Sequence, residues 1–469
     1  MNAPLVWIGL PTLFSIALLL LLRWRKVAAL SGSIFALGLA SAAWALPVGE
    51  RVQVGVLSFE IEASWLLFGR SFILESSDRP LVILLNLAIA LWFVGTLSSE
   101  VHPFFFPLGM GLSVALIAAV LIQPLYYGAI LVQLAAVISL LLFVSDYPEI
   151  DLGIKRFWVF QSLAMPPLLF AGWLLEGNEA SPDAIPSLSL LIPLLLGYSL
   201  LLSGVPFQSW LPAVAQHANP FSFAFTLFVA SFTTVLFAFS LVREFAWLVS
   251  SPWIIAFFSL QGLMMSLIGG LGALYHRHLG RFLGYILVKE LGFNFLILGL
   301  GLLSSEKSPL LALLFLQALP RGLALALLTF ASNIYRDQRG SLSIQDLVGI
   351  GRQYPLATFA YFVAVLTLAG FPLTAAFPTH LPIWQGWFER FPPIAISAVF
   401  GSIGVMIGGL RTLAALIRST GEPGWVSSEL HGQRVLLTVG GLGLLLAGIF
   451  PQWFFPLLFQ MGLTFLQGG

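Results

Sequence analysis

Two stretches in which a hydrophobic run is broken by proline and glycine decide the fold: LLLGYSLLLSGVPFQSWLPAVAQHANPFSFAF, from Leu194 to Phe225, and LTLAGFPLTAAFPTHLPIW, from Leu366 to Trp384. Irregular backbone at membrane depth persists only where protein buries it or where it lines a water-filled cavity. Paired interruptions in the two halves of a transporter chain indicate an ion or substrate path. We therefore expect the functional centre at six residues of these broken helices: Pro206, Pro212, Pro220, Gly370, Pro372 and Pro378.

The composition of the chain indicates an all-α polytopic membrane protein. Hydrophobic residues make up 59% of the 469 residues and charged residues only 9%, whereas soluble domains carry about 25% charge. The net charge of +1 provides no electrostatic footprint for nucleic acid. The absence of cysteine excludes disulfides, cysteine-ligated clusters and thiol catalysis. Because no nucleotide-binding or haem-attachment motif is present, we expect no cofactor and at most a non-catalytic subunit of an enzyme.

A spanning helix needs about 20 apolar residues, and the sequence predicts fourteen spans. The segment 49–78 is too polar to span, and its alternating VQVGVLSFEIE predicts a β-hairpin outside the membrane. The predicted spans are 4–22, 27–48, 80–98, 103–122, 124–144, 157–175, 186–204, 219–242, 252–274, 281–303, 309–333, 355–377, 394–417 and 435–460.

The distribution of Lys and Arg predicts the orientation. Twelve of these residues lie in loops after odd-numbered spans and six in loops after even-numbered spans, which places the odd loops in the cytoplasm and both termini outside. The run Pro4 to Leu22 is followed by basic residues rather than preceded by them, so we expect a spanning helix and not a cleaved signal peptide.

The spans and their breaks suggest one membrane domain over residues 1–469, with two broken helices in halves that resemble inverted repeats. We expect N-terminal helices over 4–122 with the external segment 49–78, a first antiporter-like half over 124–242, a second half over 252–384 and C-terminal helices over 394–460.

Three stretches resemble the antiporter-like subunits of respiratory complex I and of Mrp-type sodium/proton antiporters. VPFQSWLPAVAQHANPFSF (205–223) resembles the PFHxWLPxAHxxAPxPxSA signature of that family, and GRFLGYILVKELGF (280–293) resembles its KRxLAYSSISxxGF segment. SIQDLVGIGRQYPLATFAYFVAVLTLAGFPLTAAF (343–377) resembles DIDDLGGLxRxMPxTxxxFxxxxLxLAGIPPLSGF. The matches come in family order. A member of the L type would continue into a long lateral helix, and this sequence stops at Gly469, so we expect it to resemble the M, N or Mrp D types.

The resemblance implies a proton path through buried Glu and Lys residues, but this sequence departs from the pattern. Gln133 stands where the family has a glutamate on its fifth helix, and Leu201 stands at the lysine of its seventh. Phe232 and Leu325 replace two further lysines, and His380 replaces the last. A proton relay needs groups that hold and release charge, so four positions are neutral and only His380 can titrate near neutral pH.

Charged residues remain inside two predicted spans: Lys289 and Glu290 in the tenth, Arg321 in the eleventh. One interpretation is an alternative relay through these three residues and His380. The other is a structural Glu290–Arg321 ion pair in which each charge neutralises the other. The structural interpretation is favoured because Arg321 cannot release its proton. His380 would then be a hydrogen-bonded structural group.

His217 resembles a family histidine at the cytoplasmic mouth of the first break. It would lie on a proton route or cap the following helix together with Asn219, and both interpretations stay open. Gln133, Gln208 and Gln317 are expected to hydrogen-bond between helices rather than carry ions. The HRH run that starts at His276 lacks further ligands, so no metal is expected there.

Three hypotheses follow for the function. The preferred one is a membrane-arm subunit of a complex I-like assembly that has lost its own channel and acts as a spacer or adapter. Its expected partners are other membrane subunits and lipid, and its expected location is the cell inner (plasma) membrane. The alternative retains a proton or sodium path through the non-standard relay, including Mrp-type antiport or ion-driven bicarbonate uptake. An independent solute carrier is disfavoured, because the breaks offer few polar groups to pair with a polar solute.

Overall fold

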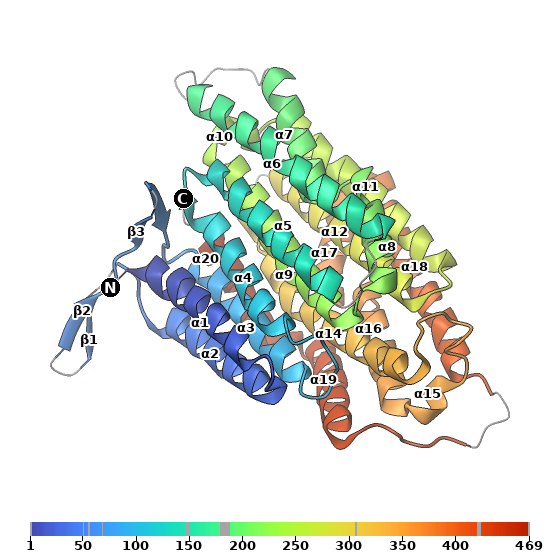
Figure 1. Ribbon diagram of the computed structural model, residues 1–469. Coiled ribbons are helices and arrows are strands. Elements are labelled where there is room, and N and C mark those ends of the chain that lie inside the picture. Colours follow the sequence, from blue (N-terminus) through green and yellow to red (C-terminus); the bar gives the residue numbers. More distant parts are fainter. Residues whose placement is uncertain are drawn as a thin grey trace.

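The helices of this protein form one bundle whose long axes run in a common direction (Figure 1). The computed structural model describes residues 2–49, 51–54, 57–67, 69–145, 151–178, 188–304, 307–419 and 424–467. Within them, nine helices are long and apolar enough to cross a membrane, and six shorter apolar helices accompany them. The prediction of an all-α polytopic membrane protein is confirmed, while the count of fourteen spans stays a prediction.

The N-terminal part contains helices on both sides of a small β region. Residues 50, 55–56 and 68 of the expected segment 49–78, and 186–187 of the seventh expected span, lie outside the described residues. The elements up to the first break are η1 (Leu5–Gly9), α1 (Leu10–Leu18), η2 (Leu19–Leu21), α2 (Arg25–Ala45), β1 (Arg51–Val54), β2 (Leu57–Glu60), β3 (Ser64–Leu67), β4 (Arg70–Ile73), α3 (Arg79–Gly95), α4 (Phe105–Leu121), β5 (Ile122–Gln123), η3 (Leu125–Tyr127), α5 (Gly128–Ser145), α6 (Leu152–Asn178) and α7 (Leu188–Leu201).

The expected hairpin is present in the β region. Strands β1 and β2 pair antiparallel, with Arg51 opposite Glu60, and they stand away from the helical bundle beside α1 and α2 (Figure 1). A second antiparallel pair, β3 and β4, is joined by β5. The location of these strands outside the membrane remains a prediction.

The rest of the chain contains both breaks and the C-terminal helices. Its elements are η4 (Phe207–Ser209), α8 (Trp210–His217), α9 (Pro220–Glu244), α10 (Ala246–Val249), α11 (Pro252–Tyr275), α12 (Leu279–Leu303), α13 (Lys307–Leu311), α14 (Leu313–Arg339), α15 (Ile350–Gln353), α16 (Pro355–Ala369), α17 (Phe377–Arg390), α18 (Pro392–Ile417), α19 (His431–Ile449), η5 (Pro451–Trp453) and α20 (Phe455–Gln467).

The last expected span, 435–460, is wrong as a single helix. Helix α19 ends at Ile449, and α20 begins at Phe455 after the short η5 turn. Pro451 lacks a backbone N–H and disfavours helical backbone in the residue before it, and Phe450 indeed has non-helical angles, φ −120° and ψ 59°. The proline therefore divides the segment into two helices.

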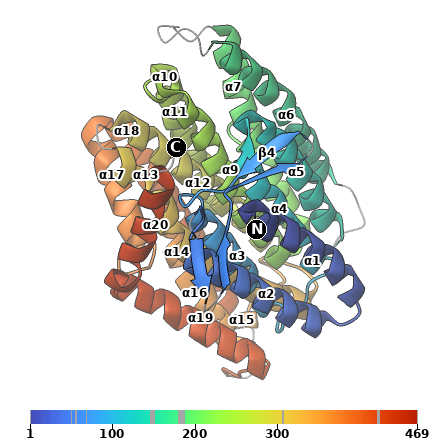
Figure 2. The same cartoon turned by 90° about the vertical axis from the view of Figure 1, so that its left-hand side faces the viewer.

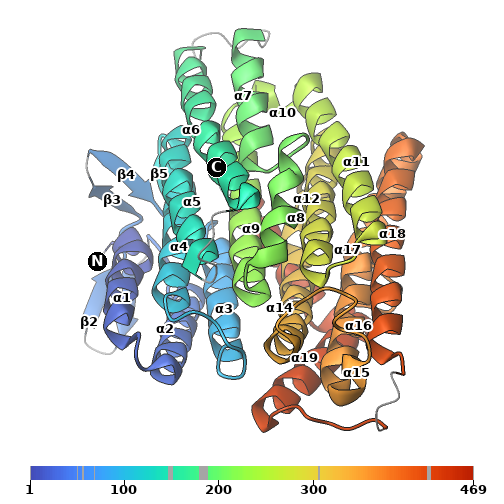
Figure 3. The ribbon, with the colours of Figure 1, turned by 45° about the vertical axis from the view of Figure 1, so that its right-hand side comes forward.

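Helices α9 and α12 lie at the centre of the bundle, and almost all of their residues are buried. Figure 2, turned by 90°, and Figure 3, turned by 45°, both show α12 and α14 with other helices on several sides. Small residues bring α12 close to its neighbours. A Cβ added to Gly284 would come 2.4 Å from the Cα of Pro212 in α8, and one added to Gly269 of α11 would come 2.5 Å from the backbone nitrogen of Lys289. Close backbone approach through small residues is typical of membrane helix packing.

Candidate functional site

The first break separates α7 from α8. The chain leaves helical geometry at Ser203, where φ is +53°, and passes through a cis Val205–Pro206 bond. The side chain of Gln261, on α11, accepts a hydrogen bond from Val205 N at 2.7 Å and donates one to Val205 O at 3.0 Å. The freed backbone is therefore satisfied by a side chain from the second half, as buried non-helical backbone requires.

The second break separates α16 from α17. Gly370 ends α16 with φ +69°, a conformation that glycine adopts without strain, and Pro378 lies in the first turn of α17. Helix α16 has 15 residues and α17 has 14, so each is about 21–23 Å long at 1.5 Å per residue. The break thus lies about midway along this helix pair.

Lys289, on α12, makes three contacts, two of which reach the second break. Its Nζ atom lies 2.9 Å from Glu290 Oε1, 2.9 Å from Leu368 O in the last turn of α16 and 2.9 Å from His380 Nε2 on α17. A lysine ammonium has three donors and no acceptor. The three contacts therefore use its full hydrogen-bonding capacity, and one of them places a cation at the negative end of the α16 dipole.

The contacts of His380 fix the charge that it shares with Lys289. Its Nδ1 atom lies 2.9 Å from Ala376 O, and because a carbonyl only accepts, Nδ1 carries a hydrogen. In a neutral ring Nε2 is then the acceptor, so Lys289 must donate to it as an ammonium. Moving that proton from Lys289 onto His380 leaves the total charge of the two side chains unchanged. The pair therefore holds one positive charge in either arrangement.

Glu290 also faces Arg321, on α14. Glu290 Oε2 lies 3.7 Å from Arg321 Nε, and the guanidinium donates to Asn294 Oδ1 at 3.2 Å and to Ser231 Oγ at 3.1 Å. Lys289, Glu290 and Arg321 are each at most 4% exposed. One carboxylate thus lies between two cationic groups, and the cluster of Lys289, Glu290, Arg321 and His380, called the charge cluster below, has a net charge of +1.

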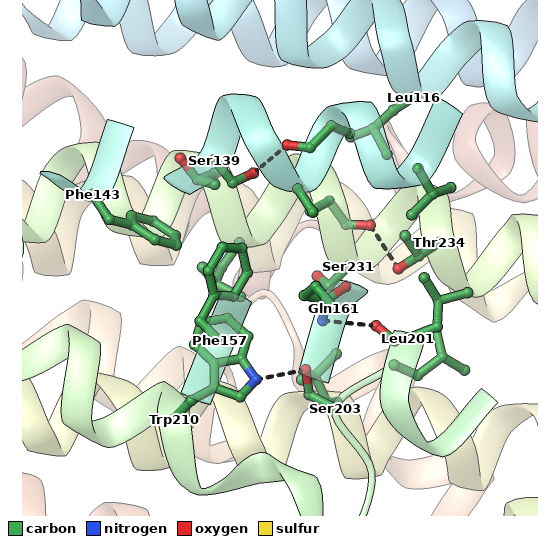
Figure 4. Close-up of a pocket in the computed structure, with 18 residues that line it drawn as sticks. Leu116, Ser139, Phe143, Phe157, Gln161, Leu201, Ser203, Trp210, Ser231 and Thr234 are labelled. Atoms are coloured by element: carbon green, nitrogen blue, oxygen red, sulfur yellow. Dashed lines mark hydrogen bonds between the residues drawn. The ribbon is translucent and has the colours of Figure 1, made fainter. Parts of the chain in front are cut away.

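A small cavity lies mainly between helices of the first half, and its lining also includes Ser231, which accepts from Arg321, and Leu291 of α12. It has a volume of about 50 Å³, which is enough for water, and Figure 4 shows the side chains around it. Gln161 Nε2 donates to Leu201 O at 3.4 Å, and Trp210 Nε1 donates to Ser203 Oγ at 3.1 Å. The labelled lining residues are Leu116, Ser139, Phe143, Phe157, Gln161, Leu201, Ser203, Trp210, Ser231 and Thr234.

The residues that the sequence resemblance places at the lysine positions of the family are buried and apolar. Leu201 lines the cavity, Phe232 packs edge-on against Phe315 with ring centroids 5.4 Å apart, and Leu325 is 0% exposed. None of these side chains can carry a proton. Among the direct hydrogen bonds between described residues, the one that joins the lining of the cavity to the charge cluster runs from Arg321 to Ser231.

The other residues singled out by the sequence lie outside the charge cluster. Gln133 Nε2 donates to Ser162 Oγ on α6 at 3.1 Å, so it bonds between helices as expected. His217 lies at the end of α8, with Nε2 3.7 Å from an Asp151 carboxylate oxygen. Asn219, rather than His217, caps α9 by accepting from Phe221 N and Ser222 N.

The prolines and glycine of the breaks have ordinary local roles. Pro206 follows a cis bond and Pro212 lies inside α8. Pro220 occupies the first turn of α9, and Pro378 does the same in α17. Pro372 lies in the connection between α16 and α17.

Sequence reasoning missed the polar residues that surround Arg321. Asn294 accepts from both Arg321 and Gln317, and Ser231 accepts from Arg321 on the cavity side. A signal was present in the spacing. Glu290 and Asn294 are four residues apart on one helix, Gln317 and Arg321 four apart on another, and residues so spaced share a helix face.

Comparison with known proteins shows a family model and curated relatives that match this chain. The model of the family described as NADH:quinone oxidoreductase/Mrp antiporter, TM, matches residues 110–408. NADH-quinone oxidoreductase subunit N of Cereibacter sphaeroides is 30% identical over 347 residues, which cover 72% of this chain and 74% of that protein.

Solved structures share the fold. A chain of respiratory complex I from Thermus thermophilus with bound NADH has a TM-score of 0.73 at 17% identity, covering 99% of this chain and 100% of that chain. A chain of the Mrp complex from Dietzia sp. DQ12-45-1b has a TM-score of 0.74 at 15% identity, covering 99% and 97%.

Proposed function

Because this chain belongs to the NADH:quinone oxidoreductase/Mrp antiporter family of transmembrane proteins, we propose that it is an antiporter-like subunit in the membrane arm of a complex I-like assembly, and that its own proton path is interrupted. It is an integral multi-pass membrane protein. Its partners in this proposal are other membrane-arm subunits, and the curated relative named subunit N supports such a place.

The cavity beside Leu201 is the main observation that supports an interrupted proton path. Its lining includes the apolar side chain of Leu201, at the position where the sequence resemblance predicts a lysine. Among the direct hydrogen bonds within the described part of the chain, the one that joins this lining to the charge cluster comes from Arg321. Because a guanidinium keeps its proton at any ordinary pH, a proton relay cannot pass through it.

The charge cluster has a structural role in this proposal. Lys289 uses all three donors to hold Leu368, His380 and Glu290 in place, and so it ties both arms of the second break to α12. Removing one partner of a buried ion pair costs about 3–5 kcal/mol. The paired charges of the cluster therefore stabilise the broken helix, whether or not any ion moves.

Two further features belong to the same proposal. The twelve-to-six distribution of Lys and Arg supports both termini outside the cytoplasm in a bacterial inner membrane. The α12 contacts with both breaks, through Gly284 and Lys289, support a single membrane domain whose halves at 124–242 and 252–384 pack together.

The assembly is tested by purification. Membranes extracted in a mild detergent and purified through a tag on this chain should yield other antiporter-like subunits in a fixed ratio, identified by mass spectrometry. Isolation of the chain alone, with proton or sodium transport after reconstitution into vesicles, would contradict both the assembly and the interrupted path.

A further inference from the structure

A pocket with charges of both signs lies at the end of the bundle where α2 begins. It has a volume of about 500 Å³ and lies between the start of α2, the connection from α3 to α4, the end of α14 and the start of α19. Two cations, Arg25 and Lys26, and two carboxylates, those of Glu100 and Asp337, line it. The family comparison and the proposed function assign nothing to this pocket, called the head-group pocket below.

Within the described residues, the four charged side chains of the head-group pocket form no ion pair at 4.0 Å or less with one another, although Arg25 interacts electrostatically with Asp337. Arg25 donates one hydrogen bond, to Ser99 O at 3.3 Å. Within the described ranges, the ion pairs at 4.0 Å or less include none of Arg25, Lys26, Glu100 and Asp337. The pocket therefore offers two cationic and two anionic groups to a ligand that carries both charges.

A stripe of exposed apolar side chains runs from this pocket along α2. Four apolar residues that are 45–69% exposed follow Lys26 on this helix: Leu30, Ile34, Leu37 and Trp44. Successive members are three or four residues apart, except that the last step is twice as long and passes one polar position. Residues at this spacing share one helix face. In a membrane this face requires an apolar partner, because the α2 contacts lie mainly with α3.

A second pocket lies at the other end of the stripe. It has a volume of about 270 Å³ and is lined by Trp44, Arg79, Gln460 and Thr464, among others. Lys26 and Trp44 are eighteen residues apart, or about 27 Å along the helix, close to the roughly 30 Å of a hydrocarbon core. Figure 2 views this side of the bundle, with α2, α19 and α20 toward the reader. If α2 crosses the bilayer along this stretch, the head-group pocket lies at the depth of lipid head groups.

We propose that the head-group pocket binds a phospholipid whose head group carries both a phosphate and a primary ammonium, such as phosphatidylethanolamine, with its acyl chains along the stripe of α2. Arg25 and Lys26 pair with the phosphate, and Glu100 and Asp337 accept from the ammonium. A purely anionic head group would satisfy the cations and leave two carboxylates beside a negative charge. The balance of two cations and two acids therefore selects a zwitterion.

Lipid retention tests this selectivity. The intact membrane complex is placed in nanodiscs of equimolar phosphatidylethanolamine and phosphatidylglycerol, extracted in detergent, and the retained lipid is measured by mass spectrometry. We expect enrichment of phosphatidylethanolamine. The Arg25→Gln/Lys26→Gln variant should retain about tenfold less of it, because it loses both cations that pair with the phosphate, and a tenfold change corresponds to about 1.4 kcal/mol. Arg23→Gln, which changes an arginine that does not line the pocket, should retain the lipid as the native chain does.

The acidic variant provides the sharper result. Glu100→Gln/Asp337→Asn should shift the retained lipid toward phosphatidylglycerol by about tenfold, because only the cations remain. Variants of opposite charge that both keep the native melting temperature exclude a folding defect. Equal retention of the two lipids by the native chain, or unchanged selectivity in the acidic variant, would overturn the proposal.

A photo-crosslinking amino acid at position 34 identifies the occupant of the stripe. A phospholipid adduct in native membranes is the expected product. An adduct with a polypeptide would show that a partner helix covers this face, and the lipid proposal would then be wrong.

Discussion

Replacing Glu290 by glutamine tests the structural role of the charge cluster. Glu290 is the one carboxylate between Lys289 and Arg321, so the Glu290→Gln variant raises the net charge of the cluster from +1 to +2 in a site that is almost wholly buried. Removal of one partner from a buried ion pair costs about 3–5 kcal/mol. Since proteins are stable by about 5–15 kcal/mol, we expect a marked loss of assembled protein and a lower unfolding midpoint in detergent.

A second substitution should restore part of this stability. The Glu290→Gln/Arg321→Gln variant returns the cluster to its native charge of +1, and Gln retains donors for Asn294 and Ser231. We expect it to regain at least half of the lost free energy of unfolding. The single variant Arg321→Gln leaves Glu290 paired with Lys289, so it should be milder than Glu290→Gln.

The measurement is thermal unfolding of the purified complex, together with proton pumping normalised to the assembled protein. A Glu290→Gln variant that assembles normally, has the native midpoint and has lost pumping would refute the structural account and support a relay.

Three further predictions concern packing and pH. Gly284→Ala should lower the unfolding midpoint, because the new Cβ would lie 2.4 Å from the Pro212 Cα. The control Gly38→Ala has open space around the new Cβ and should be neutral or stabilising by up to about 1 kcal/mol. Equal midpoints for the two variants would contradict the packing between α12 and α8. Burial lowers the pKa of His276 to about 4 from 6.5, so the unfolded chain takes up this proton at a higher pH than the folded chain. The free energy of unfolding should therefore decrease as the pH falls from 6.5 to 4, by no more than about 3 kcal/mol. Unfolding curves of His276→Gln should lack this part of the decrease. Burial raises the pKa of Asp78 to about 6 from 3.8, so its contribution should be lost as the pH rises from about 4 through 6, and Asp78→Asn should remove that dependence.

The parts of the structure that sequence predicted are those with local causes. Both breaks follow from proline and glycine within apolar runs, and the β1–β2 hairpin follows from alternation along a short segment. The division at Pro451 also had a local cause, but the surrounding residues are so apolar that hydropathy alone gave one span. Local residue types, above all proline and glycine, therefore predict where the helices break.

The site depends on how helices are rotated and packed, which hydropathy does not reveal. The contact of Lys289 with His380 and Leu368 joins three helices from distant parts of the chain, and nothing in the spacing of these residues brings them together. Asn294 and Ser231 are ordinary polar residues in the sequence, and they become part of the site only because Arg321 points between them.

The ratio of protons pumped per turnover tests the central claim most directly. It is measured in vesicles containing the whole assembly, with Lys289→Gln or His380→Gln in this chain and the content of assembled complex held equal. An interrupted path predicts the native ratio in both variants, because neither side chain carries a transported proton. A lower ratio in an assembly with native subunit content would show that the charge cluster conducts, and the account would be wrong.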